Sequence, residues 1–307
     1  MMILLWGLHD DSPLEAVSKA IHRKGLPMVF LDQRDVGSME IELSIGARVR
    51  GIVRLKNQIV DLETVTAFYL RPHDSRRLPD VLQAGEGSAS WRHAIRFEDS
   101  MLSWSEVTRC LVINRPSAMA SNSSKPYQSL RIGVHGFKTP ETLVTTSPEA
   151  ARDFWKMHEK VIYKSVSGIR SIVSRLTNDH LGRFQDITNC PTQFQRYISG
   201  VDHRVHVIGK EVVASKVVSE ANDYRYASRE GRTIKIEATR VPDKIEHMCR
   251  SLASDLDLTV AGVDLRVTPD GDWYCFEVNP SPGFTFYEAA TGQPLAEKIA
   301  SLLENTL

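Results

Sequence analysis

The most informative part of the sequence is residues 261–283, AGVDLRVTPDGDWYCFEVNPSPG. Two apolar-rich segments flank the turn-forming residues 268–272, TPDGD, and this arrangement predicts a pair of antiparallel strands. Glu277 and Asn279 stand two residues apart, so their side chains point to the same face of the second strand. If the two strands pair through the turn, Asp264 of the first strand lies across from both.

These three side chains offer oxygen donors without histidine or cysteine. Such a set is typical of a site for a hard cation such as Mg²⁺, which normally also binds phosphate oxygens. A pair of solvated edge strands whose acids face water would show the same alternation. The sequence Pro-Ser-Pro-Gly after Asn279 and the apolar neighbours of Glu277 are unusual for solvated strands. We therefore interpret Asp264, Glu277 and Asn279 as candidate metal ligands.

These motifs resemble the C-terminal pattern of the ATP-grasp superfamily, and of its RimK-like carboxylate–amine ligases in particular. The resemblance extends over roughly residues 115–307 and rests on Gly262-Val263-Asp264, Glu277-Val278-Asn279, Ser281-Pro282-Gly283 and Tyr287-Glu288. It implies an α/β (α+β) protein with an ATP-grasp fold and an N-terminal Rossmann-like pre-ATP-grasp α/β domain. It also implies ATP as cofactor, with two Mg²⁺ ions held by the three candidate ligands, for which Mn²⁺ can substitute.

Two lysines are candidates for nucleotide binding. Lys164 lies in a predicted strand over 160–165 and precedes the small residues Ser167 and Gly168, where backbone N–H groups can bind phosphate. A lysine in a strand is otherwise more often a solvated edge charge. The resemblance implies that Lys164 and the loop after it bind the nucleotide phosphates. Lys125 matches the nucleotide-binding lysine that occurs earlier in the sequences of the family.

The predicted strand over 192–198 resembles the family's hinge, where backbone groups read the edge of adenine. Arg196 stands where relatives often have an acid, and this departure is compatible with recognition by backbone. An ordinary amphipathic strand would show the same alternation. The resemblance gives nucleotide-binding roles to Gln195, Arg196, Tyr197, Ile198 and Asp202, the last of them near the ribose.

Arg204 and Arg225 are the candidate catalytic residues. The resemblance places the first near the transferred phosphate or the substrate, and the second near the acyl phosphate. Phosphoryl transfer requires cations around the developing charge more than it requires covalent help from the protein. Isolated arginines are more often solvated surface groups, so both assignments depend on the resemblance.

Strands and helices alternate in the first 115 residues, which predicts a separate α/β domain. The polar stretch 74–90 predicts a surface loop, and 115–125 predicts a linker. We expect strands at 2–8, 27–32, 49–55, 58–62, 65–70, 110–114, 141–145, 160–165, 171–176, 192–198, 203–208, 211–218, 260–267 and 272–278. We expect helices at 12–24, 91–109, 126–134, 148–158, 242–256 and 292–305. The predicted division is an N-terminal domain (1–118), an ATP-grasp lid subdomain (119–198) and a C-terminal subdomain with the metal site (199–307).

The charge balance excludes two classes of partner. The chain has 307 residues with 38 basic and 38 acidic side chains, so its formal net charge is zero. Capture of nucleic acid or of an anionic membrane requires clustered positive charge, and we expect neither partner. The four cysteines form no CxxC pair, which fits a reducing cytoplasm. A homo-oligomer is compatible with the sequence.

The resemblance predicts an ATP-dependent ligase that forms an amide or ester through an acyl phosphate, with a peptide or amino acid as substrate. Tyr69-Leu70-Arg71-Pro72 resembles ATP-grasp maturases of ribosomally made peptides. The second kind of ligase that the resemblance allows is a RimK-like enzyme that adds an amino acid to a protein end or to a small molecule. The alternatives are an ATP-grasp kinase that phosphorylates a small-molecule hydroxyl and a non-catalytic nucleotide-binding module. Retention of all three candidate metal ligands disfavours the module.

Overall fold

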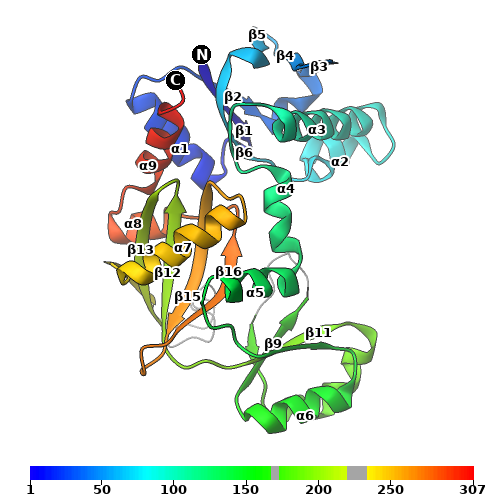
Figure 1. The fold of residues 1–307 in the computed structure, drawn as a ribbon. Coiled ribbons are helices and arrows are strands. Elements are labelled where there is room, and N and C mark those ends of the chain that lie inside the picture. Colours follow the sequence, from blue (N-terminus) through cyan, green and yellow to red (C-terminus); the bar gives the residue numbers. More distant parts are fainter. Residues whose placement is uncertain (167–172, 220–233) are drawn as a thin grey trace.

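The structure, a computed structural model, describes residues 1–166, 173–219 and 234–307 (Figure 1). Within these residues helices and strands alternate around four β-sheets, two of them N-terminal, one central and one C-terminal. This mixed architecture confirms the predicted α/β class. No helix in the described part of the chain is long and apolar enough to cross a membrane.

The larger N-terminal sheet is parallel and has helices on both faces, as parallel sheets require. Its elements are β1 (Met2–Gly7), α1 (Ser12–Arg23), β2 (Met28–Asp32), β6 (Val65–Arg71), α3 (Ala89–Val107) and β7 (Leu111–Ile113). The strand order is β2-β1-β6-β7. Ile3 and Leu5 pack in one core with α1, whereas Leu4 and Trp6 pack in another with α3. The period of two along β1 therefore distributes its side chains between two cores.

The smaller N-terminal sheet has three antiparallel strands. The predicted hairpin is present as β4 (Val49–Arg54) and β5 (Ile59–Asp61). A third strand, β3 (Glu40–Ile45), pairs with β4 and was not predicted. Its sequence, EIELSI, alternates Ile41, Leu43 and Ile45 with polar residues, so the period of two that indicates a strand was present and was overlooked.

Two segments predicted to lack helices contain short ones. The predicted loop 74–90 contains α2 (Pro79–Ala84), and the predicted linker 115–125 contains α4 (Pro116–Met119). Both helices begin at a proline, whose fixed φ suits the first helical turn. Each buries an apolar side chain, Val81 in α2 and Ala118 in α4. Their brevity explains why periodicity could not reveal them.

The central sheet has the strand order β10-β9-β11-β8. Its elements are β8 (Thr142–Thr145), α6 (Pro148–His158), β9 (Val161–Ser165), β10 (Ser174–Arg175), the 3₁₀ segment η5 (Asn178–Asn189) and β11 (Thr192–Arg196). The sequence analysis assigned no helix to residues 178–189. Phe184 of η5 packs with Phe194 and with Ala151 of α6, so η5 and α6 cover one face of this sheet.

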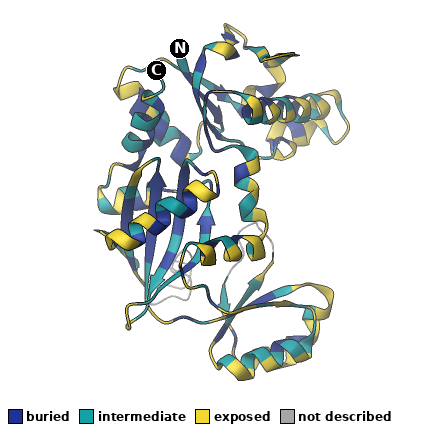
Figure 2. Ribbon diagram, in the orientation of Figure 1, coloured by how far each residue is buried: buried dark blue, intermediate teal, exposed yellow. Residues whose placement is uncertain are grey.

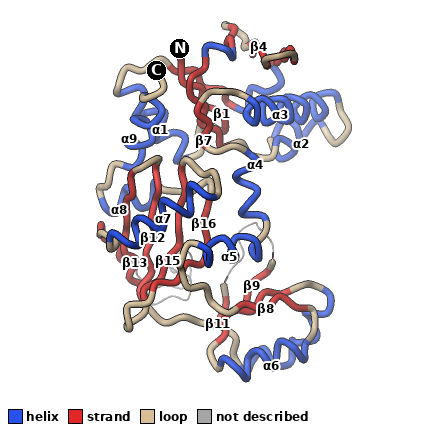
Figure 3. Tube along the Cα trace, in the orientation of Figure 1, coloured by secondary structure: helices blue, strands red, loops and turns tan. Residues whose placement is uncertain are grey.

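The C-terminal sheet is antiparallel with the order β14-β13-β12-β15-β16. Its elements are β12 (Val201–Ile208), β13 (Glu211–Ser219), β14 (Ile234–Thr239), α7 (Asp243–Asp255), β15 (Val260–Val267), β16 (Trp273–Asn279), α8 (Thr285–Thr291) and α9 (Leu295–Glu304). Helix α7 lies across one face (Figure 3). β14 and α8 were not predicted, and the terminal helix starts at Leu295 instead of residue 292, directly after Pro294.

Helix α5 (Lys125–Val134) packs on the C-terminal sheet, although the predicted division places it with the lid. Its buried Ile132 shares a core with Val205 of β12 and Leu252 of α7. Lys138 then forms a parallel bridge with Tyr274, which extends the same edge beside β16. Figure 1 shows α5 next to β16 and away from α6.

The N-terminal and C-terminal segments share one hydrophobic core. Leu14 and Val17 of α1 pack in the same cluster as Leu295 and Ile299 of α9. Figure 2 shows buried residues in the strands on both sides of this contact. The two segments therefore pack together closely.

Asn114 joins these segments with its side-chain amide. Its Oδ1 accepts the N–H groups of Thr259 at 2.9 Å and Val260 at 3.2 Å. Its Nδ2 donates to the carbonyls of Val260 at 2.7 Å and Pro280 at 2.6 Å. Asn114 is buried and continues the hydrogen bonding of β15 beyond the end of β16.

We expect Asn114→Ala to lower the free energy of unfolding by about 2–4 kcal/mol, because it leaves buried backbone donors and acceptors without partners. Urea denaturation followed by circular dichroism measures this change, with the exposed Asn305→Ala as control. An Asn114→Ala midpoint equal to that of the control would contradict the role of this amide.

Candidate active site

Three neighbouring strands align the predicted acids with Arg204. In the strand registers, Arg204 of β12 stands opposite Asp264 of β15, and Asp264 stands opposite Glu277 of β16. Asn279 stands opposite Gly262, further along the same pair of strands. The period of two directs Arg204, Asp264, Glu277 and Asn279 to one face of the sheet. The structure thus brings the three candidate metal ligands together.

Each of the two carboxylates accepts a hydrogen bond from a cation. Arg204 Nη1 lies 2.6 Å from Asp264 Oδ1, and Lys125 Nζ lies 2.5 Å from Glu277 Oε1. Lys125 is the first residue of α5, so the packing of this helix on β16 positions its ammonium group. All four side chains are less than a quarter exposed. Their charges therefore interact in a partly desolvated environment, where neither partner is tolerated alone.

The donor set fits a hard divalent cation. Within the described ranges no three His, Cys, Asp or Glu side chains could hold a metal ion together, so the set depends on the Asn279 amide. Asn279 Oδ1 accepts the N–H of Ser281 at 2.9 Å, which orients it and leaves a second lone pair. Mg²⁺ sites in nucleotide enzymes commonly use one or two carboxylates and complete the shell with water and phosphate.

Gly262 makes room for the Arg204 side chain. A β-carbon at Gly262 would lie 2.1 Å from Arg204 Nη2, so any other residue here would displace the guanidinium group from this position. The ring of Tyr287 lies 5.8 Å from the guanidinium carbon of Arg204. Arg204 is only 5% exposed, so its orientation is fixed by packing. The sequence analysis used this glycine as part of the motif and did not identify its steric role.

His206 lies next to Arg204 on the same face of β12. It is buried, and its ring packs edge-on against Tyr287 with 5.2 Å between centroids. Neither ring nitrogen has a hydrogen-bond partner in the part of the chain that the structure describes. Burial, and secondly the charge of Arg204, holds the pKa of His206 well below its ordinary value. His206 is therefore neutral at pH 7.

Arg266 connects the hinge to Asp202, and the sequence analysis missed it. Its guanidinium forms a paired interaction with the Asp202 carboxylate at 2.6 and 2.9 Å. Its Nη1 also donates to the carbonyl of Ile198 at 2.7 Å. Arg266 stands two residues after Asp264 on the same strand, so the period of two could have indicated its position.

The hinge backbone is partly occupied by bonds within the protein. Arg196 N–H donates to the Glu141 carbonyl at 2.9 Å, and Tyr197 N–H donates to the Lys160 carbonyl at 2.8 Å. The Arg196 side chain is exposed and lies 3.4 Å from the Glu141 carboxylate. The N–H groups of Arg196 and Tyr197 therefore already have partners within the protein. Ile198 follows them and is buried.

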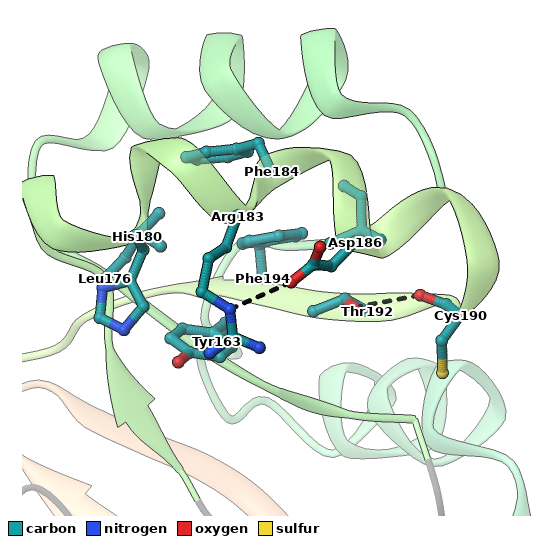
Figure 4. A pocket seen from close by; sticks show the side chains of 10 residues that line it. Tyr163, Leu176, His180, Arg183, Phe184, Asp186, Cys190, Thr192 and Phe194 are labelled. Atoms are coloured by element: carbon teal, nitrogen blue, oxygen red, sulfur yellow. Dashed lines mark hydrogen bonds and ion pairs between the residues drawn. The ribbon is translucent and has the colours of Figure 1, made fainter.

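Lys164 and the cavity shown in Figure 4 belong to opposite faces of the central sheet. Lys164 stands opposite Gln193 in the register, whereas Tyr163 stands opposite Phe194. Figure 4 shows Tyr163 and Phe194 beside Phe184, lining a cavity of about 220 Å³. The alternation directs Lys164, Gln193 and Gln195 to the other face. This cavity is thus separate from the predicted nucleotide-binding side chains.

Three of the predicted site residues lie outside the described residues: Ser167, Gly168 and Arg225.

Arg71 reaches the loop that follows Asn279 from the N-terminal segment. Its Nη1 donates to Ser281 Oγ at 2.7 Å, and its Nε lies 2.7 Å from Asp11 Oδ1. Both charged side chains are less than 15% exposed. The sequence analysis singled out the Tyr69-Leu70-Arg71-Pro72 motif, but nothing in it indicated a contact with residue 281.

Comparison with known families and sequences identifies relatives of this chain. The model of the RimK-like ATP-grasp domain matches residues 121–303. N-acetylaspartylglutamate synthase A of Mus musculus is 27% identical over 229 residues, which cover 68% of this chain and 58% of that protein. A probable alpha-L-glutamate ligase of Aeromonas salmonicida is 28% identical over 210 residues, 65% of this chain and 70% of that protein. The chain thus spans less than two thirds of the synthase.

Solved structures share the fold over the whole chain. The macrocyclase MdnC of Microcystis aeruginosa, bound with its precursor peptide MdnA, has a TM-score of 0.81 and 22% identity, with 99% of this chain and 100% of that chain covered. A RiPP-associated ATP-grasp ligase of Chryseobacterium gregarium, in complex with ADP and a leader and core peptide, has a TM-score of 0.82 and 21% identity, with 100% and 98% covered. These likenesses confirm the predicted ATP-grasp fold.

We expect acid to destabilise the protein through His206. The folded state holds this imidazole neutral, whereas the unfolded chain binds a proton near the ordinary pKa of 6.5. The unfolded state therefore binds more protons as the pH falls below that value, and folding stability decreases. In His206→Leu, the loss of unfolding free energy between pH 7.5 and 5.5 should be smaller by about 1 kcal/mol.

Urea denaturation at both pH values measures this difference, with the exposed His22→Leu as control. An unchanged pH dependence in His206→Leu would show that His206 is not the buried neutral group.

Proposed function

This chain belongs to the RimK-like ATP-grasp family, and we propose that it is an ATP-dependent ligase that joins a carboxylate to an amine or a hydroxyl. A carboxylate oxygen of the substrate attacks the γ-phosphorus of ATP, which releases ADP and gives an acyl phosphate. The amine or hydroxyl then attacks the acyl carbon, loses its proton, and phosphate leaves as the amide or ester forms. The observation that carries this proposal is the register that aligns Arg204, Asp264 and Glu277.

Asp264, Glu277 and Asn279 would hold two Mg²⁺ ions. Bound Mg²⁺ would neutralise phosphate charge and orient the γ-phosphate for attack. The carboxylates support this role because each already attracts a cation within 2.6 Å, Arg204 at one and Lys125 at the other. Metal bound at these carboxylates would leave Arg204 and Lys125 available to phosphate oxygens.

ATP would lie between the central and C-terminal sheets. Lys164 lies one residue before the end of β9, on the face opposite the cavity of Figure 4, and Gln195 shares that face. We assign Lys164 to the phosphates and the segment from Gln195 to Ile198 to the adenine. Asp202 would contact the ribose, held in orientation by Arg266.

A peptide or amino acid is the proposed substrate. Named relatives include glutamate ligases and a macrocyclase bound with a precursor peptide. Arg204 suits the transferred group because its planar fork can bind two oxygens at once, whereas lysine offers a point charge.

The proposed function is tested with ATP, Mg²⁺ and peptides that carry acidic side chains together with Lys, Ser or Thr. We expect Mg-ATP to raise the unfolding temperature, since it binds the folded state selectively. We also expect ADP release and a peptide product lighter by one water. ADP with a stable phosphoester would indicate a kinase instead. Nucleotide binding without turnover of any acceptor would indicate a non-catalytic module.

We expect Glu277→Gln and Asn279→Ala each to reduce ADP release by about 100-fold or more, because each removes a proposed ligand of the ions. Far-UV circular dichroism verifies the fold, and Glu237→Gln, on β14 of the same sheet, is the matched control. Near wild-type turnover in either site variant at saturating substrate contradicts the metal assignment.

We expect Arg204→Lys to lower kcat by about 10- to 100-fold and to change ATP affinity little, because the interaction matters most as charge develops on the transferred group. Steady-state kinetics and calorimetric ATP binding separate the two effects. Arg131→Lys is the control, since Arg131 pairs with Asp255. A variant that loses only ATP affinity would remove Arg204 from the catalytic role.

A further inference from the structure

A buried glutamine holds the strand that carries two of the proposed metal ligands. Gln128 of α5 is 1% exposed, and its Nε2 donates to the Val278 carbonyl at 2.7 Å. The Val278 N–H donates in turn to Gln128 Oε1 at 3.0 Å. One side-chain amide therefore satisfies both backbone groups of a single strand residue.

This contact falls at the free edge of the sheet. β16 is the last strand in the order β14-β13-β12-β15-β16, so beyond the isolated bridge between Lys138 and Tyr274 it has no partner strand on its outer side among the described residues. Gln128 replaces that partner at one position, because its amide presents a donor and an acceptor in one plane, as a peptide group does. Without it, two buried backbone groups would be unsatisfied, and the strand edge would shift or admit water.

Val278 is the residue between Glu277 and Asn279. Its side chain is fully buried, and its backbone is held by Gln128. The same helix presents Lys125 to Glu277, one helical turn before Gln128. A single rigid element therefore fixes both the carboxylate and the peptide unit beside it.

We infer that Gln128 is a positioning residue for the metal ligands Glu277 and Asn279. This inference rests on the proposed function, because it requires those residues to bind the ion. Partners of this kind, which orient ligands without touching the metal, typically change metal affinity or activity by about 10- to 100-fold when removed.

The chain contains a matched control for a merely structural glutamine. Gln33 is also 1% exposed, and it binds the backbone of His73 in the same manner. Its Nε2 donates to the His73 carbonyl at 2.9 Å, and the His73 N–H donates to Gln33 Oε1 at 2.8 Å. Each of the two Met variants thus removes the same kind of hydrogen-bond pair. Gln33→Met removes it away from β16, and Gln128→Met removes it at β16.

The test measures Mn²⁺ binding by electron paramagnetic resonance, with a non-hydrolysable ATP analogue present, for the wild type and both Met variants. We expect similar decreases in unfolding temperature for the two variants. We expect about 10- to 100-fold weaker Mn²⁺ binding for Gln128→Met alone. The Mg²⁺ concentration for half-maximal ADP release should rise by a similar factor, with a smaller change in kcat at saturating Mg²⁺.

Wild-type Mn²⁺ affinity in Gln128→Met, or equal weakening in both variants, would reduce Gln128 to a structural role and overturn the inference. If Gln128→Met does not fold, Gln128→Asn takes its place, because the shorter amide cannot reach both backbone groups; the same two results decide. A wild-type protein that binds no Mn²⁺ with nucleotide overturns the proposed function itself, and this inference with it.

Discussion

The register between β15 and β16 is the constraint on which the rest of the site depends. A shift by one residue would turn Glu277 and Asn279 to the opposite face of the sheet, toward α7. The fully buried Val278 between them packs in the α7 core, which opposes such a shift. The turn adds a bond of 2.9 Å from Thr268 N–H to the Asp272 carbonyl. Burial of one face thus fixes the charged residues on the other.

The charged face is balanced by local pairs. Lys125 with Glu277, Arg204 with Asp264, and Arg266 with Asp202 each join a cation to a carboxylate. Partly buried charges require such partners, because transfer of an unpaired charge out of water is costly. In the proposed reaction the same charged groups would exchange partners. The carboxylates would bind metal, and the cations would bind phosphate. The site is therefore stable before it binds nucleotide.

The helices that were not predicted have weak local patterns, whereas the missed strands β3 and β14 alternate with a period of two. The structure contains the predicted apolar strands of the larger N-terminal sheet and of the C-terminal sheet. It also contains the predicted amphipathic helices α1, α6 and α7. β14, which pairs with β13, was missed although Ile234 and Ile236 alternate with Lys235 and Glu237 as in a strand. α2, α4 and α8 span only one or two turns, too few for a helical period to emerge. The 3₁₀ segment η5 is polar around most of its circumference, with Phe184 as its buried anchor.

The resemblance of the motifs in residues 261–288 predicted the ATP-grasp fold, and the period of two along two strands joined by a turn predicted that Asp264, Glu277 and Asn279 lie together. The groups that hold these ligands became clear from the packing of the folded chain. Gln128 contacts Val278, and Arg71 contacts Ser281, across 150 and 210 residues of chain. Such contacts leave no periodic signal, because they arise from the packing of separate elements into shared cores and not from the conformation of any one segment.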